Sequence, residues 1–423
     1  MTDCVEIALT SDTAALHWSC SAWDVRTGTQ LMTYRNGGPS GPNTLLTVSN
    51  KFVVAGNLTK PILTIWPINR QEPAHVKYML PATAGAVAIS PDGNHCLVAH
   101  LHSFTVYNLH TGASMATIAH HYGKVTVLRF TDDGTHFVSA GQDCRIVVWN
   151  LARTVQQKDA GRMLYELADF TLPVSDVLVG KGGMKAILAA VSLDRSAKLY
   201  ELATGRILLS VLFPVALSVL SLNALETELF VGDKKGLIYA CNLQSVPRSK
   251  EIHLQQDQLE RSVFRGHKKS VTCLSVSMDN ETLLSGSEDE SVIVWHVRTR
   301  QQLKLIPHKA PITNAFFIVT PRSMFDQSRE VPITFPPFQK MVSTRQDRER
   351  AIFELPILNK SLRERSTSGL AIEELLPTTV GFVNNISKGT EIEELEQEVQ
   401  RLKGINQRLY QQSIRAIMNE VEQ

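Results

Sequence analysis

Four polar residues in the stretch from Gly266 to Trp295 have the types and the spacing to form one buried hydrogen-bond chain. They are His267, Ser285, Asp289 and Trp295. An imidazole, a hydroxyl, a carboxylate and an indole N–H can bond to one another, and a satisfied buried network of this kind fixes a single strand register. The chemistry that these residues predict is therefore structural: the side chains hold strands together.

Three antiparallel strands must position these side chains. Apolar and polar residues alternate in residues 271–277, 282–287 and 291–295, and polar turns separate the three segments. A period of two with many β-branched residues is typical of strands with one buried face. A second copy of the pattern contains His121, Ser139, Asp143 and Trp149. In both copies the His lies four residues before the first strand.

The spacing between the Asp and the aromatic residue recurs along most of the chain. Five pairs are six positions apart: Asp143/Trp149, Asp194/Tyr200, Asp233/Tyr239, Asp289/Trp295 and Asp347/Phe353. Trp23, Trp66 and Tyr107 lie in similar strand contexts without the Asp. Successive aromatic residues of this series are 39 to 58 residues apart. A phased series of this length predicts a repeat architecture.

The pattern resembles the WD repeat, one four-stranded blade of a β-propeller, and His296 stands where the Asp of the repeat's name usually lies. The predicted fold class is all-β, a WD-repeat β-propeller followed by a C-terminal α-helical coiled coil. The series contains eight aromatic residues, called here the aromatic corners. Seven blades are usual for this repeat, so both seven and eight blades remain possible. Ring closure between the two ends of the propeller is expected because it removes both sheet edges. The blades around Tyr200 and Tyr239 have no His partner and are expected to depend on packing.

Composition limits the classes of function. With 423 residues, 43% of them hydrophobic, and a net charge of +2, the chain can bury a large core and shows no gross signal for binding nucleic acid or acidic substrates. Six cysteines without a C-x-x-C motif predict reduced thiols in a cytosolic or nuclear protein. The acidic, alternating N-terminal residues do not have the pattern of a signal peptide, so none is expected. Residues 207–225 carry no charge, but Pro214 predicts two strands joined by a turn rather than a membrane helix.

No catalytic, metal-binding or cofactor-binding residue is predicted. The motifs G-x-x-x-x-G-K-[ST], G-x-S-x-G and H-E-x-x-H do not occur in the sequence. The glycine turn at residues 180–183 lacks the helix start of a phosphate site. The pairs His100/His102 and His120/His121 have no Cys or carboxylate at ligand spacing. The charged run of residues 340–365 is expected to be a solvated surface, and direct contact with RNA there stays open.

Three segments follow from these patterns: a propeller over residues 1–356, a polar linker with a short helix over residues 357–389, and a helix over residues 390–423. The propeller carries a Pro-rich insertion at residues 321–340. Long inserted loops tend to be functional. Its three phenylalanines, Phe325, Phe335 and Phe338, are expected to be exposed and are therefore candidates for docking a partner.

The C-terminal segment changes its apolar period from 2 to 3.5. Positions a and d of the heptads hold, in chain order, Ile392, Leu395, Val399, Leu402, Asn406 and Leu409. A β-branched residue at a with Leu at d favours a parallel two-stranded coil, and one Asn at a fixes its register. We expect a parallel homodimer. The alternative is an amphipathic helix that packs on another subunit or on the propeller.

Taken as a whole, the chain resembles the WD repeat-containing protein 18 family, the propeller subunits of the rixosome. The resemblance is carried by the N-terminal VEIALTSDTAALHWSCSAWDVRTG, the repeat at FVSAGQDCRIVVWNL and the terminal GTEIEELEQEVQRLKGINQRLYQQS. Repeats of this type are widespread, so the combination of propeller and coil is the specific part.

That resemblance implies a non-enzymatic scaffold of the nucleus, nucleolus and nucleoplasm, with a cytoplasmic pool left open. It implies a role in maturation of the large ribosomal subunit and in removal of the second internal transcribed spacer. The implied partners are a large helical-repeat subunit, an endonuclease and polynucleotide kinase module, and the pre-60S particle. Two rivals stay open: a substrate receptor of a ubiquitin ligase, and a propeller that binds RNA directly. Fold alone does not decide among them.

Overall fold

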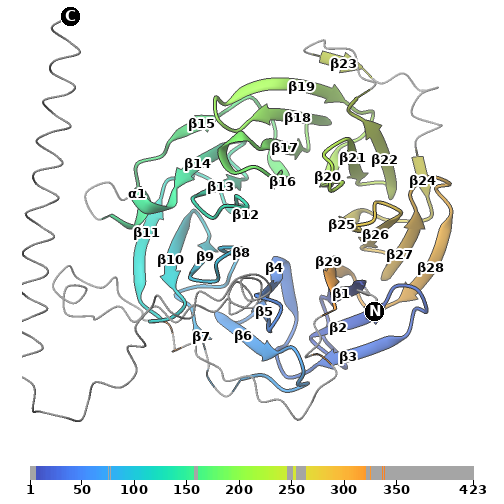
Figure 1. Cartoon of the computed structure of the whole chain (residues 1–423), viewed down its shortest axis with the longest axis horizontal. Coiled ribbons are helices and arrows are strands. Elements are labelled where there is room, and N and C mark those ends of the chain that lie inside the picture. The colour runs from blue at the N-terminus through green and yellow to red at the C-terminus, as the bar shows by residue number, and fades with distance from the viewer. Residues whose placement is uncertain are drawn as a thin grey trace, which may run out of the picture. The chain divides into compact units, whose positions relative to one another are not determined.

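Seven β-sheets form a closed ring around a common axis (Figure 1). The computed structural model describes residues 6–74, 76, 78–156, 161–244, 251–253, 263–320, 324, 336 and 338. The chain divides into two compact units, Met1–Asn359 and Lys360–Gln423, and every described residue lies in the first.

The sheets are numbered here as blades, with strands given from the inside of the ring outward. Blade 1 consists of β29 (Ile312–Val319), β1 (Glu6–Asp12), β2 (Cys20–Asp24) and β3 (Gln30–Tyr34). Blade 2 consists of β4 (Ser40–Val48), β5 (Phe52–Asn57), β6 (Ile62–Pro67) and β7 (Tyr78–Met79). Blade 3 consists of β8 (Ala86–Ile89), β9 (His95–His100), β10 (Ser103–Asn108) and β11 (Ser114–Ala119).

Two short helical segments accompany blades 4 and 5. Blade 4 consists of β12 (Val125–Phe130), β13 (His136–Gly141), β14 (Ile146–Asn150) and β15 (Tyr165–Leu167), with α1 (Leu151–Val155) between the last two. Blade 5 consists of β16 (Val174–Val179), β17 (Ile187–Ser192), β18 (Ser196–Glu201) and β19 (Arg206–Leu212), with the 3-10 turn η1 (Gly183–Lys185) after β16. A fifth strand, β23 (Glu251–His253), pairs with β19 in parallel.

The last two blades complete the ring. Blade 6 consists of β20 (Leu217–Leu222), β21 (Glu228–Asp233), β22 (Leu237–Asn242) and β24 (Val263–Arg265). Blade 7 consists of β25 (Val271–Val276), β26 (Thr282–Ser287), β27 (Ser291–His296) and β28 (Gln302–Pro307). The predicted all-β propeller is confirmed, and the described residues form seven blades. The eighth aromatic corner, Phe353, lies outside these residues.

The two ends of the strand series close the ring within blade 1. Strand β29 supplies the innermost strand, and β1 pairs with it antiparallel from Glu6↔Val319 to Asp12↔Ile312. The expected closure is thus present, with one C-terminal strand completing three N-terminal ones. Closure leaves no inner-strand edge open at this junction.

The hydrophobic core lies between neighbouring blades. Trp149 of blade 4, for example, is fully buried and packs edge-on against Phe104 of blade 3, with 5.2 Å between ring centroids. Trp66 and Trp295 are buried to the same extent in their blades. An edge-to-face aromatic pair adds to the stabilisation from burial. The aromatic corners found in the sequence therefore join blades to one another.

A belt of hydroxyl groups links the inner strands. In four successive blades the second residue of the inner strand donates to the carbonyl oxygen of the first residue in the next inner strand. The bonds join Thr126 Oγ1 to Val174 O (3.4 Å), Ser175 Oγ to Leu217 O (2.8 Å), Ser218 Oγ to Val271 O (2.6 Å) and Thr272 Oγ1 to Ile312 O (2.8 Å). Asn314 Nδ2 of β29 then donates to Gly41 O of β4 at 2.8 Å. The belt therefore connects blades 4, 5, 6, 7, 1 and 2.

The uncharged stretch of residues 207–225 forms strands, as predicted. It contains most of β19, a turn at Pro214, and β20. Within the part of the chain that the structure describes, no helix is both long enough and apolar enough to cross a membrane.

One expectation about the insertion is wrong. Phe338, predicted to be an exposed docking residue, is 8% exposed and belongs to the core of blades 2 and 3. Its ring stacks on Tyr107 at 4.4 Å and meets Tyr78 edge-on at 5.3 Å. Met324 is likewise buried, against blades 1 and 2. The local sequence is polar and Pro-rich, and only the ring supplies the pockets that bury these side chains.

Candidate functional site

The four polar residues of blade 7 form one hydrogen-bonded cluster. Such a cluster of His, Ser or Thr, Asp and Trp side chains is called here a corner. His267 Nε2 lies 2.7 Å from Ser285 Oγ, and Trp295 Nε1 donates to the same oxygen at 2.7 Å. His267 Nδ1 lies 3.1 Å from Asp289 Oδ2. The loop before β25 supplies the His, β26 the Ser and β27 the Trp. The corner therefore ties two strands to the loop that joins blades 6 and 7.

Burial and charge decide the protonation state of this corner. Burial lowers the pKa of His267 below its usual range, against the opposing effect of the Asp289 carboxylate. For Asp289, burial acts to raise the pKa, but hydrogen bonds from Ser291 and from the Lys268 backbone N–H outweigh it and hold the pKa low. A neutral imidazole beside an ionised carboxylate donates through Nδ1–H and accepts through Nε2. Each polar hydrogen of the chain then has an acceptor.

Blade 4 repeats the corner. His121 Nε2 lies 2.7 Å from Ser139 Oγ, and Trp149 Nε1 donates to Ser139 Oγ at 2.9 Å. His121 Nδ1 lies 2.9 Å from Asp143 Oδ2, which also accepts the Tyr122 backbone N–H at 3.1 Å. Burial lowers the pKa of His121. The eight residues that the sequence assigns to two networks thus form two networks of the same geometry.

A third corner, in blade 1, was missed from the sequence. Trp23 Nε1 donates to Thr10 Oγ1 at 2.9 Å, and Thr10 Oγ1 lies 3.3 Å from Nε2 of the buried His308. His308 stands four residues before β29, as the other two His stand four residues before their strands. This spacing was the available signal, but the partners are 298 residues apart. The corner therefore links the N-terminal strands β1 and β2 to the segment just before the last strand, β29.

The blades without a His partner differ from each other. In blade 6, Tyr239 OH donates to Asp233 Oδ2 at 3.2 Å, so this blade keeps a polar contact in addition to the expected packing. Burial raises the pKa of Asp233. In blade 5, Asp194 instead accepts from Ser196 and from the Thr171 backbone N–H. In both blades the Asp carboxylate accepts hydrogen bonds from its own turn, and in blade 5 it also accepts one from the loop that enters the blade.

Replacing Asp289 with Ala is expected to lower the free energy of unfolding by about 1–3 kcal/mol, because Nδ1 of the buried His267 loses its carboxylate acceptor. The Lys268 backbone N–H loses the same acceptor at the exposed edge of the corner. Denaturant unfolding followed by tryptophan fluorescence measures the change. Glu288→Ala, an exposed position next to it, is the matched control and should leave the unfolding midpoint in place. An unchanged midpoint for the Asp289 variant would show that the corner does not support the fold.

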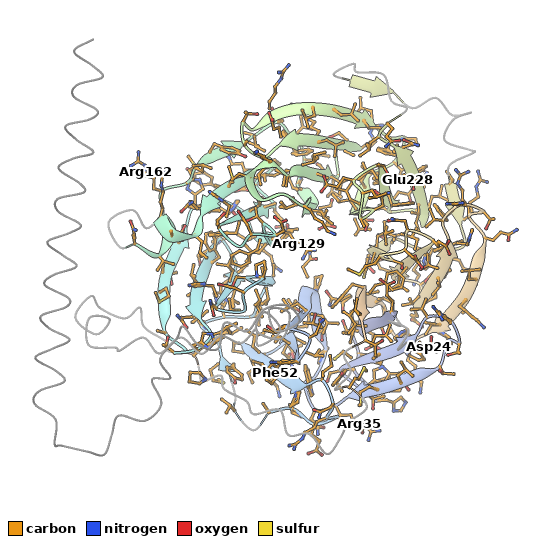
Figure 2. The ribbon with its side chains drawn as sticks, viewed as in Figure 1. Asp24, Arg35, Phe52, Arg129, Arg162 and Glu228 are labelled. Carbon is orange, nitrogen blue, oxygen red and sulfur yellow. The ribbon has the colours of Figure 1, made fainter. Side chains whose placement is uncertain are left out.

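Polar contacts between inner strands also line a small cavity at the axis. Arg129 Nη2 lies 3.9 Å from Asp176 Oδ1 and donates to Asn43 Oδ1 at 3.4 Å. Asp176 Oδ2 accepts the Leu220 backbone N–H at 3.2 Å. Figure 2 shows Arg129 on the inner side of its blade. Burial raises the pKa of Asp176, with Arg129 opposing. Side chains from blades 2, 4 and 5 and a backbone N–H of blade 6 are thus linked next to the cavity, whose volume is about 260 Å³.

One end of the ring, called here the loop face, gathers exposed side chains suited to contacts with other proteins. It is formed by the loops between the second and third strands of each blade and by the loops that enter each inner strand, because antiparallel strands place both at one end. Blades 1 to 5 each expose one large apolar residue there: Leu16, Leu58, Leu101, Tyr122 and Leu172. Blades 6 and 7 carry Lys234, Lys235, Lys268 and Lys269 in the same two kinds of loop. Exposed apolar side chains gathered on one face are typical of interaction surfaces.

The remaining candidates from the sequence fall outside the described residues. These are Phe325 and Phe335 of the insertion and the six heptad residues Ile392, Leu395, Val399, Leu402, Asn406 and Leu409. Their roles stay predictions. Across the described ranges, no group of three or more His, Cys, Asp and Glu side chains could hold a metal ion.

The closed ring of seven sheets, six with four strands and one with β23 as a fifth, and its two His–Ser–Asp–Trp corners define a WD-repeat β-propeller. The family model described as WD domain, G-beta repeat, matches residues 112–150 and 259–296, which include the two regular corners. Similar relatives include WD repeat-containing protein 18 of Rattus norvegicus, 34% identical, and of Homo sapiens, 32% identical, each alignment covering 98% of both chains. The chain therefore belongs to the WD repeat-containing protein 18 family. Pre-rRNA-processing protein pro-1 of Caenorhabditis briggsae is 24% identical over 74% of this chain and 61% of that protein.

Proposed function

We propose that this chain is a non-enzymatic scaffold subunit in the processing of pre-ribosomal RNA during maturation of the large ribosomal subunit. The observation that carries the proposal is similarity over 98% of both chains to WD repeat-containing protein 18, together with the more distant similarity to a protein named for pre-rRNA processing. The buried state of the His and Asp side chains supports it, because their hydrogen bonds serve the fold. A rigid ring with an apolar and basic loop face suits a subunit that binds other proteins.

The finer proposal is membership of the rixosome in the nucleus and nucleolus. In that assembly the chain would bind a large helical-repeat subunit and help to hold the endonuclease and polynucleotide kinase module that removes the second internal transcribed spacer. Residues 390–423 would supply a homodimer, which places two rings in one scaffold. Phe325 and Phe335 of the insertion are the proposed docking residues, without Phe338.

Depletion of the chain from its native cells is expected to accumulate precursor RNA that still contains the second internal transcribed spacer, as measured by hybridisation blots. Affinity purification of the tagged chain should recover the helical-repeat subunit, the endonuclease and the kinase. The Phe325→Ala/Phe335→Ala variant should lose part of this set, while the exposed-site variant Leu305→Ala should keep all of it. Recovery of a ubiquitin-ligase adaptor with normal precursor RNA would reject the proposal.

A further inference from the structure

Three open depressions adjoin one another on the loop face of blades 5, 6 and 7. Their volumes are about 450, 550 and 260 Å³. The first and second share Lys235, the second and third share Lys234, Ser270 and Glu288, and the first and third share Leu193. The third is the cavity at the axis described above. We call these three adjoining depressions together the basic groove.

Positive charge dominates the basic groove. Its lining contains five cationic side chains, Arg195, Lys234, Lys235, Lys268 and Lys269, and three carboxyl side chains, Asp176, Asp194 and Glu288. Two of the three carboxyls are already used by the fold, because Asp176 faces Arg129 and Asp194 accepts hydrogen bonds from Ser196. Glu288 is the one remaining. The four lysines have no carboxylate oxygen within 4.0 Å among the described residues.

The four lysines lie close together because the two loops that carry them are in contact. Gly236, with φ +92°, ends the turn of Lys234 and Lys235, and a Cβ built there would lie 2.7 Å from the carbonyl oxygens of His267 and Lys269. The turn of blade 6 therefore touches the loop of blade 7. The corner of blade 7 holds that loop, since Asp289 Oδ2 accepts the Lys268 backbone N–H at 2.9 Å. Four like charges held this close, with Glu288 as the one remaining carboxylate of the lining, attract an anionic partner.

We propose that the basic groove binds an extended acidic segment of a partner protein that also carries aliphatic residues. Charge complementarity supplies the attraction and steers the encounter. Apolar side chains of the groove, among them Leu172, Leu193 and Val215, would accept aliphatic residues between the acidic ones. None of the lining residues is aromatic, whereas single-stranded nucleic acid is usually held by stacking on aromatic rings. The inference deepens the proposed scaffold function by naming a surface and a partner chemistry, but it depends on the groove alone.

The test measures binding of a fluorescein-labelled peptide of repeated Glu-Glu-Leu triplets to the full chain by fluorescence anisotropy. Binding should weaken as salt is raised, because screening reduces the attraction, and a Gln-Gln-Leu peptide should not bind. The Lys234→Glu/Lys268→Glu variant should bind the acidic peptide at least about tenfold more weakly. Lys185→Glu/Lys304→Glu, with the same change of charge outside the groove, should bind like the wild type. Thermal unfolding of both variants checks that the ring is intact.

Three results would overturn the inference: no binding of the acidic peptide by the wild-type chain, equal binding by both double variants, or tight binding of oligouridylate without binding of the peptide. The last would assign the groove to nucleic acid. None of them bears on the purification and depletion experiments, so the scaffold proposal and the groove can fail separately. Conversely, a chain that purifies without ribosome-processing partners but binds the acidic peptide through these lysines would keep the groove and reject the scaffold.

Discussion

The Ile312→Asp variant is expected to lose the closed ring. Ile312 is 1% exposed, starts β29, and packs in the core shared by blades 1 and 7. An aspartate there would place an unpaired carboxylate in an apolar site at the junction where the two ends of the strand series meet. A graded series sharpens the test: Ile312→Val should cost about 0.5–1.5 kcal/mol and Ile312→Ala about 2–5 kcal/mol of unfolding free energy.

Urea unfolding followed by tryptophan fluorescence gives the free energies, and soluble yield reports on the aspartate variant. The matched control is Leu305→Asp, the same new charge at a residue that is 52% exposed on β28. That variant should unfold like the wild type. If Ile312→Asp were as stable as the control, β29 would not be the strand that closes the ring.

The second large effect concerns the predicted coil of residues 390–423. Leu402→Asp is expected to abolish dimerisation, because it places a charge at a d position in the apolar seam. Asn406→Ile should make the coil more stable while allowing more than one oligomeric state. Paired Asn side chains bond to each other only in the two-stranded register, so the Asn selects that register at a cost in stability.

Light scattering coupled to size-exclusion chromatography on the full chain measures both variants. Gln400→Asp, at the outward-facing b position of the same heptad, is the control and should remain dimeric. A wild-type chain that is monomeric at micromolar concentration would mean that this helix binds another subunit. The proposal of two rings in one scaffold would then fall, while the single ring and its groove would be unaffected.

The local patterns of the sequence were sufficient to predict the blades and two of the corners. His267, Ser285, Asp289 and Trp295 lie within one blade and its entry loop, so alternation, turn residues and spacing determine their relative positions. The same holds for residues 207–225, where Pro214 separates two strands. A local pattern is reliable here because each blade is a meander of consecutive strands.

Contacts between blades could not be predicted in the same way. The corner of His308, Thr10 and Trp23 joins residues 298 positions apart, and its His carries no signal beyond its distance from the next strand. The hydroxyl belt rests on an apolar residue followed by Ser or Thr at the start of an inner strand, a pair too common to predict a contact. Only the closed ring brings each hydroxyl to the neighbouring carbonyl.

The number of blades, the burial of Phe338 and the basic groove were likewise decided by the tertiary structure. Eight aromatic corners in the sequence allowed eight blades, and the pairing of β29 with β1 completes seven. Phe338 lies in a polar, Pro-rich segment, yet Tyr78 and Tyr107 from two blades form its pocket. The lysine pairs at 234–235 and 268–269 are unremarkable as charged turns. They form one surface because the turn of blade 6 contacts the loop that enters blade 7. The contact is at Gly236, where there is no room for a side chain.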